Sequence, residues 1–166
     1  MKILIVSDTH GHESGLEEAI EKETPFDMLI HCGDVEGREF IVEAMAECPC
    51  SIVAGNNDFF SDLPREDEFR ISGKRVLVTH GHYYGISAGM DVLIQAAKSR
   101  GCEIVFYGHT HRPEIKEENG VLAINPGSLA YPRQRGGEKS YAVMTTDGRG
   151  NIKTEIKYLK KRIFSR

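Results

Sequence analysis

The chain has 166 residues, of which 40% are hydrophobic and 28% are charged, as in an ordinary globular domain rather than a disordered chain. Its net charge is −4, so no overall basic field is available to gather nucleic acid. No run approaches the ~18–20 apolar residues of a membrane span, and the apolar start Ile3–Val6 leads directly into Ser7 and Asp8, unlike a signal peptide. We therefore predict one cytoplasmic domain over residues 1–166 that makes no membrane contact.

The first half of the chain alternates apolar runs with amphipathic segments. Three runs are nearly continuous in apolar residues, as in strands buried on both faces: Lys2–Val6, Met28–His31 and Ser51–Ala54. Between them, apolar residues recur at helical spacing, first at Leu16, Ala19 and Ile20 and then at Phe40, Ile41, Ala44 and Met45. Ser14 stands three residues before Glu17, which predicts a capping box. This β-α-β-α-β order predicts parallel strands with right-handed crossovers.

The second half of the chain is richer in strands. Segments Glu68–Ile71 and Arg75–Thr79 flank Ser72 and Gly73 as a hairpin, and a helix is expected over Met90–Arg100. After an expected strand at Glu103–Tyr107, the hairpin dipeptides are Asn119-Gly120 and Asp147-Gly148. The last strand, Ile152–Tyr158, alternates apolar and charged residues, and residues 159–166 are expected to form a frayed basic tail. The expected fold is α/β: a four-layer α/β/β/α sandwich of two mixed sheets flanked by helices.

Side chains that can bind metal follow five of the expected strands. The segments are Asp8-Thr9-His10, Gly33-Asp34, Gly55-Asn56-Asn57-Asp58, His80-Gly81-His82 and Gly108-His109-Thr110-His111. Because the carboxyl ends of parallel strands meet at one edge of a sheet, these groups are expected to converge. Residues at i and i+2 also point to the same side of an extended backbone. One such histidine would be more typical of a structural residue, but five segments together predict a metal site.

Other polar residues are open to a structural interpretation. His31 lies inside an expected strand and is interpreted as a core histidine, while His12 is expected to be exposed. Ser128 is expected to bind backbone at a turn rather than act as a nucleophile. Arg112 and Arg133 could pair with phosphate oxygens through both guanidinium nitrogens.

The order D-x-H, G-D, G-N-x-D, H-G-H, G-H-x-H resembles the calcineurin-like metallophosphoesterase family, and in particular its small, cap-less YfcE-type phosphodiesterases. The match runs from Lys2 to Ser128. The resemblance implies a phosphodiesterase, rather than a monoesterase, that acts on a small phosphate ester through a metal-bridging hydroxide. It implies two divalent ions, one held by Asp8, His10 and His111 and one by Asn56, His80 and His109, with Asp34 between them. Nucleic acid is expected only as a substrate.

The expected ligands are imidazoles, carboxylates and an amide, with no thiolate. This donor set suits Mn²⁺, which we expect, or Ni²⁺, Co²⁺, Fe²⁺ or Zn²⁺, better than Ca²⁺ or Mg²⁺.

One position departs from the family pattern. Many members carry G-N-H-[DE] where this chain has Asn57, and that histidine is expected to help protonate the leaving group. An amide can donate a hydrogen bond but cannot act as a general acid. Asn57 and His82 are therefore the candidate catalytic residues, and activity is expected mainly on esters with acidic leaving groups unless His82 substitutes.

Two other functions remain open. A non-catalytic protein-binding scaffold on the same fold, like the retromer subunit, would be expected to have lost ligand positions, whereas all seven are present here. A metal-sensing or storage protein would need no substrate cleft. The adjacent Phe59 and Phe60 could form an exposed patch for a homo-oligomer or could belong to the core.

Overall fold

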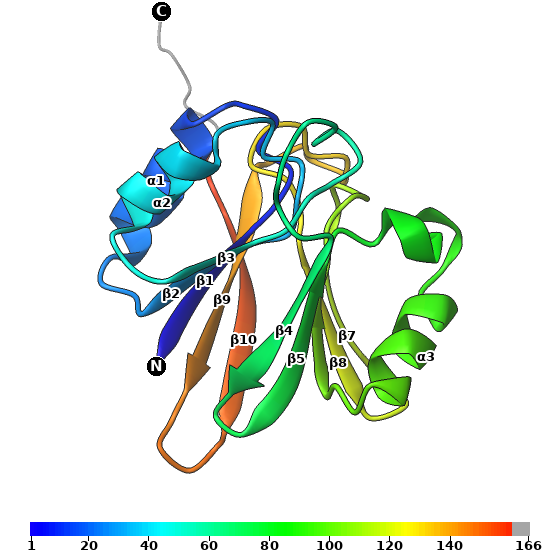
Figure 1. The fold of residues 1–166 in the computed structure, drawn as a ribbon. Helices are drawn as coiled ribbons and strands as arrows, with labels where there is room; N and C mark the ends of the chain where they lie inside the picture. Colours follow the sequence, from blue (N-terminus) through cyan, green and yellow to red (C-terminus); the bar gives the residue numbers. More distant parts are fainter. Residues whose placement is uncertain (161–166) are drawn as a thin grey trace, which may run out of the picture.

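Two five-stranded sheets pack face to face, with helices on both outer faces (Figure 1). This computed structural model describes residues 1–160. Helices α1 (Ser14–Glu23) and α2 (Glu39–Ala46) cover the first sheet, and α3 (Asp91–Ser99) covers the second. The expected four-layer α/β/β/α sandwich is confirmed. Within the described residues, no helix has the length and apolar character needed to cross a membrane.

The first sheet has the strand order β10-β9-β1-β2-β3. Its strands are β1 (Lys2–Val6), β2 (Met28–His31), β3 (Cys50–Ile52), β9 (Ser140–Thr146) and β10 (Ile152–Tyr158). β1 pairs in parallel with β2, and β2 pairs in parallel with β3, while β9 runs antiparallel to both β1 and β10. The β-α-β-α-β prediction for the first half is therefore confirmed.

The second sheet has the strand order β4-β5-β6-β8-β7. Its strands are β4 (Glu66–Ile71), β5 (Lys74–Thr79), β6 (Ile104–Phe106), β7 (Pro113–Glu118) and β8 (Val121–Pro126). The three central strands are parallel, and the two edge strands are antiparallel to their neighbours. Two short 3₁₀ helices, η1 (His82–Tyr84) and η2 (Ile86–Ala88), connect β5 to α3.

The position of β1 between two apolar layers explains why its sequence is apolar on both faces. Ile3 and Ile5 pack in the core between the two sheets, whereas Leu4 and Val6 pack under α1 and α2. All four side chains are fully buried. Burial of a side chain of this size stabilises the fold by about 1.5–3 kcal/mol, so this central strand fixes the position of the residues that follow it.

Two helix predictions were wrong in detail. Ser14 is the first residue of α1 rather than its cap: Glu13 holds the cap position, and no side-chain cap bond forms, so the capping box is absent. In α2, Phe40 is 77% exposed, and the buried residues are Val42 and Ala46. Because α2 is apolar around most of its circumference, periodicity alone did not identify the face that packs on the sheet.

The two predicted hairpin dipeptides behave differently. Asn119 and Gly120 both have positive φ angles, 52° and 78°, and form the two-residue turn between β7 and β8. Asp147 instead begins a five-residue loop, where its carboxylate accepts hydrogen bonds from the backbone N–H groups of Arg149 and Asn151. The two-residue turn predicted there was wrong, because this carboxylate stabilises a longer loop.

The end of the chain is partly outside the described residues. Leu159, which was expected in the frayed tail, is buried and donates its backbone N–H to Lys139 O over 2.8 Å. The described structure therefore includes two residues of the expected tail, Leu159 and Lys160, and the others, 161–166, lie outside the described residues.

Candidate metal centre

The residues predicted to bind metal lie in loops at the same end of the two sheets. These loops follow β1, β2, β3, β5 and β6 and gather at the top of Figure 1. Because the sheets face each other, the loops of one sheet meet those of the other there. The convergence expected from strand order is therefore present in space.

One group of donors comes from both sheets. The ligand atoms of Asp8, His10, Asp34 and His111 all lie within 4.8 Å of one another. Asp8 Oδ1 is 3.1 Å from His111 Nε2, and Asp34 Oδ2 is 3.7 Å from His10 Nε2. Asp8 and Asp34 are almost completely buried, so their charges are shielded from water.

The two histidines of this group turn their Nε2 atoms toward each other. His10 Nδ1 is 2.6 Å from the Glu36 carboxylate, and His111 Nδ1 donates to Tyr131 O over 2.7 Å. Both partners are acceptors, so in the neutral rings the protons sit on Nδ1. The unprotonated Nε2 atoms are then only 3.2 Å apart. Such facing lone pairs are stabilised by a cation between them.

A second group of donors surrounds the side-chain oxygen of Asn56. This oxygen lies 3.0 Å from His80 Nε2 and 2.9 Å from His109 Nδ1. The other ring nitrogen of His80, Nδ1, donates a hydrogen bond to Cys32 O over 2.6 Å. Asp34 Oδ2 is 3.5 Å from His80 Nε2, so the Asp34 carboxylate lies within reach of both groups. All seven predicted ligands are therefore brought together.

The charges of the site favour a cation. Burial opposes ionisation of Asp8, but the neighbouring His111 and His80 and a hydrogen bond from Ser7 outweigh it and lower its pKa. For Asp34, burial is likewise outweighed, mainly by His80 and Asn57, and the pKa is lowered. Asp8 Oδ1 is buried, and none of the residues that the structure describes donates a hydrogen bond to it. An ionised, buried oxygen that lacks a donor fits a metal ion well.

Backbone conformation at the site is unusual. Five of the seven predicted ligands have positive φ angles between 46° and 69°: Asp8, His10, Asp34, His109 and His111. Non-glycine residues rarely adopt this region, and such strain, about 1–3 kcal/mol for each residue, is concentrated at functional sites. Glycines give the necessary room. A Cβ atom on Gly55 would lie 2.1 Å from Asp34 Oδ1, and one on Gly108 would lie 2.7 Å from Asp8 Oδ2.

Sequence reasoning missed the residues that support the ligands. Asp58, which is buried, accepts hydrogen bonds from the backbone N–H groups of Asp34, Glu36 and Gly55 and so joins the loops after β2 and β3. Glu36 orients His10, as described above. Asp58 ends the G-N-x-D motif, which was a signal for it, whereas Glu36 carried none because its partner is distant in sequence.

The candidate catalytic residues occupy different positions. Asn57 donates its side-chain amide to Asp34 Oδ2 over 2.7 Å. His82 begins η1 and lines a cavity of about 400 Å³ together with Asn56, Arg65 and Tyr83. Burial, His80 and His109 lower the pKa of His82, and its buried Nδ1 atom has no hydrogen-bond partner among the described residues.

The remaining polar candidates are structural. His31 is fully buried, accepts the Gly33 N–H at Nδ1 and contacts Thr9 Oγ1 through Nε2, and burial lowers its pKa to about 4. The core interpretation of His31 is confirmed. Ser128 is also confirmed as a turn residue: its hydroxyl donates to Asp8 O and accepts the N–H of Tyr131.

Three exposed aromatic or imidazole side chains were also singled out. His12 is exposed, as expected, and its Nε2 atom is 2.7 Å from the hydroxyl of Tyr131. Phe59 and Phe60 are 77% and 105% exposed, which excludes the core alternative for this pair.

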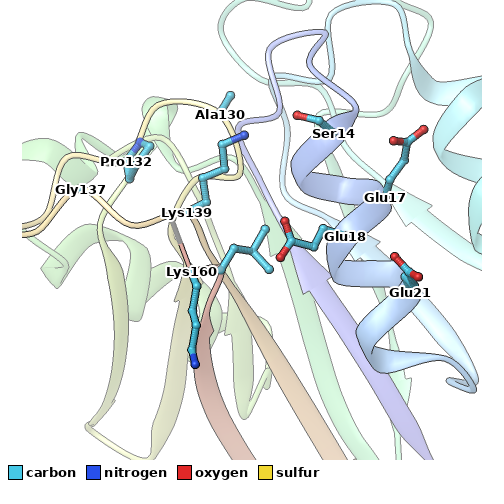
Figure 2. A pocket seen from close by; sticks show the side chains of 10 residues that line it. Ser14, Glu17, Glu18, Glu21, Ala130, Pro132, Gly137, Lys139 and Lys160 are labelled. Carbon is cyan, nitrogen blue, oxygen red and sulfur yellow. The ribbon is translucent and has the colours of Figure 1, made fainter. Parts of the chain in front are cut away.

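Another hollow lies away from the predicted ligands. It has a volume of about 640 Å³ and is bordered on one side by Glu17, Glu18 and Glu21 of α1 and on the other by Lys139 and Lys160 (Figure 2). None of the seven predicted ligands lines it. The candidate chemistry therefore belongs to the strand-end loops rather than to this hollow.

Comparison with known proteins identifies the family of the chain. Residues 1–149 match the calcineurin-like phosphoesterase superfamily domain. The chain is 37% identical over 150 residues to the probable metallophosphoesterase YsnB of Bacillus subtilis, covering 89% of this chain and 85% of YsnB. It is 35% identical over 145 residues to the phosphodiesterase MJ0936 of Methanocaldococcus jannaschii, covering 76% of this chain and 83% of MJ0936.

A solved structure shares the fold at lower identity. It is that of Vps29 from Entamoeba histolytica in complex with Zn²⁺, with a TM-score of 0.75, 19% identity, and coverage of 95% of this chain and 99% of that one. At this identity the likeness concerns the fold alone. The family match and the relatives show that the chain belongs to the calcineurin-like phosphoesterase superfamily, whose named relatives here are metallophosphoesterases and phosphodiesterases. The cluster of aspartates and histidines is accordingly a candidate site for divalent metal.

Proposed function

We propose that the chain is a phosphodiesterase that depends on two divalent metal ions. Asp8, His10 and His111 would hold one ion, Asn56, His80 and His109 would hold the other, and Asp34 would contact both. The single observation that carries the proposal is the convergence of these side chains around Asp34, beside the buried Asp8 Oδ1 atom, which receives no hydrogen bond from residues 1–160. Mn²⁺ is the ion we expect, with Ni²⁺, Co²⁺, Fe²⁺ or Zn²⁺ as alternatives, because the donors are imidazole, carboxylate and amide.

Ions bound there would supply a hydroxide nucleophile, since coordination lowers the pKa of water from about 15.7 toward about 7, and would offset charge on the phosphate. The chain itself orients the site. Glu36 and Tyr131 O hold the rings of His10 and His111, and Asp58 holds the loops that carry Asp34 and Asn56. This preorganisation means that little rearrangement is needed when the substrate binds.

The leaving group would enter the cavity beside His82. Arg65 lies over the ring of Tyr83, 5.0 Å from its centroid, at the edge of this cavity, and supplies a positive charge near the substrate. The side-chain amide of Asn57 is hydrogen-bonded to Asp34 and cannot act as a general acid. Burial, His80 and His109 lower the pKa of His82, so its neutral form, a weak general acid, is favoured at neutral pH. We expect esters with acidic leaving groups to be the better substrates.

A diester substrate is favoured over a monoester. MJ0936 is named a phosphodiesterase and is 35% identical to this chain. A scaffold on the same fold is the competing function, and the likeness to Vps29 supports it through the fold only. The presence of all seven predicted ligands argues for the enzyme, because a scaffold has no need to keep five of them in left-handed backbone conformations.

The test is a hydrolysis assay of metal-stripped protein resupplied separately with Mn²⁺, Ni²⁺, Co²⁺, Zn²⁺ and Mg²⁺. Bis-p-nitrophenyl phosphate and p-nitrophenyl phosphate serve as diester and monoester. We expect turnover of the diester to return with Mn²⁺ and to be absent in Asp34→Ala. No turnover with any metal, despite bound ions, would reject the enzyme in favour of the scaffold.

A further inference from the structure

A groove beside the candidate metal centre is lined by three arginines. Its volume is about 820 Å³, and its walls include Arg112, Arg133 and Arg135 together with Thr110, Glu114 and Gln134. None of the seven predicted ligands contributes to it. The groove is therefore a separate surface from the place where the reacting phosphate would lie.

The groove is nevertheless attached to the candidate metal centre through His111. Thr110 and Arg112 are its two neighbours in the chain, and the backbone N–H of Arg133 donates to His111 O over 3.0 Å. The side-chain amide of Asn125 donates a hydrogen bond to the Thr110 hydroxyl over 3.0 Å. This bond fixes the loop that carries Thr110 and Arg112. A ligand group in the groove would consequently lie next to a phosphate bound at the centre.

The three arginine side chains are without partners in the part of the chain that the structure describes. Other arginines are paired: Arg75 lies 2.9 Å from a Glu68 oxygen, and Arg100 lies 2.6 Å from a Glu66 oxygen. The one carboxylate in the groove, Glu114, accepts a hydrogen bond from the Tyr107 hydroxyl over 2.9 Å.

The arginines and Glu114 together give the groove a formal charge of about +2, because guanidinium keeps its proton at all ordinary pH values. The protein as a whole carries a net charge of −4. The three guanidinium groups are exposed, so they are free to turn toward an anion in the groove. Their planar forks match the oxygens of phosphate, and a phosphate also carries more charge than a carboxylate.

We propose that this groove binds a second, non-reacting phosphate of the substrate. The inference rests on the proposed function and narrows it: the substrate class is a phosphodiester that carries a further phosphate next to the reacting one, as in a nucleoside 5′-phosphodiester that also has a 3′-phosphate. Such a phosphate would be bound equally in the ground state and the transition state. It should therefore lower KM and leave kcat nearly unchanged.

The test uses two substrates that differ by one phosphate. These are the 5′-(p-nitrophenyl phosphate) of thymidine with and without a 3′-phosphate, given to the Mn²⁺-loaded protein. We expect the 3′-phosphate to lower KM about tenfold in the wild type. In Arg133→Ala and Arg112→Ala, the ratio of the two KM values should fall toward one. The matched control is Arg149→Ala, which removes the same charge from the β9–β10 loop and should keep the tenfold ratio.

A second measurement does not depend on catalysis. Calorimetry should detect binding of inorganic pyrophosphate to the metal-free protein, weakened at least fivefold in the double variant Arg112→Ala/Arg133→Ala and unchanged in Arg149→Ala. Equal KM values for the two esters in an active wild type would overturn the groove proposal and leave the phosphodiesterase standing. No turnover of either ester would instead reject the phosphodiesterase, and equal pyrophosphate affinities in all variants would reject the groove.

Discussion

The side-chain amide of Asn57 donates a hydrogen bond to Asp34 Oδ2 over 2.7 Å, and its backbone N–H donates to Asp34 Oδ1 over 2.8 Å. Both oxygens of this carboxylate are thus held by a single residue. The bonds fix the orientation of a carboxylate that is within reach of both groups of donors. Asn57 is therefore a positioning residue for Asp34, and it has no proton to give to a leaving group.

This arrangement predicts a strong dependence on the leaving group. An aryl ester such as bis-p-nitrophenyl phosphate releases a stable anion, whereas an alkyl diester requires a proton at its leaving oxygen. General-acid help is worth about 10²–10⁴ in rate, so the alkyl diester should be cleaved slower by about that factor. Asn57→His should increase alkyl-ester turnover. Similar rates for the two esters in the wild type, or no gain in the histidine variant, would contradict this explanation.

Replacing Asp58 should lower stability and activity together. Its carboxylate accepts three short backbone hydrogen bonds, from Asp34, Glu36 and Gly55. Asp58→Asn turns one acceptor oxygen into a donor that faces buried N–H groups, which costs about 2–3 kcal/mol in the free energy of unfolding. Urea unfolding measures this loss. Asp62→Asn, in the same loop but exposed, should change stability by less than about 0.5 kcal/mol, and equal losses in both variants would refute the role of Asp58.

Glu23 gives a prediction for acid stability. The residue is buried, which opposes its ionisation, but hydrogen bonds from Lys157, Lys2 and Tyr141 outweigh this and lower its pKa from 4.5 to about 2. Because the folded-state pKa lies below that of the unfolded chain, the stabilisation is fully present above pH 4.5 and is lost as the pH falls toward 2. Glu23→Gln should lower the free energy of unfolding by about 2 kcal/mol at pH 7 and flatten its fall below pH 4.5.

The control for Glu23 is Glu21→Gln, an exposed position on the same helix. Its unfolding free energy should follow the wild-type pH curve closely. An unchanged acid transition in Glu23→Gln would mean that this buried cluster does not determine acid stability.

Gly55 should be required for metal binding through its lack of a side chain. A Cβ atom there would lie 2.1 Å from Asp34 Oδ1 and 2.4 Å from the Asp34 backbone nitrogen, closer than real contacts allow. Gly55→Ala should therefore displace Asp34 and weaken Mn²⁺ binding at least tenfold by calorimetry. Gly148→Ala, where the added carbon meets nothing within 4 Å, is the matched control and should bind Mn²⁺ normally. Normal binding by both variants would show that the Asp34 loop adapts.

The sequence predicted the strands and the site because both depend on local patterns. An apolar run that ends at Gly33-Asp34 identifies a strand and its loop together, and the parallel order brings such loops to one edge. The buried face of α2 was not predictable in this way, because Phe40 and Val42 are both apolar and only contact with the sheet selects between them. The pairing of Glu36 with His10 joins residues 26 positions apart, and no local pattern indicates it.

The most direct test of the two-ion centre is a count of bound ions. Metal-stripped protein would be titrated with Mn²⁺ in a calorimeter, and bound metal would be counted by mass spectrometry of the intact chain. The two-ion account predicts two Mn²⁺ per chain in the wild type, one in His111→Ala and strongly weakened binding of both in Asp34→Ala. A single ion in the wild type, or two tightly bound ions in Asp34→Ala, would contradict it.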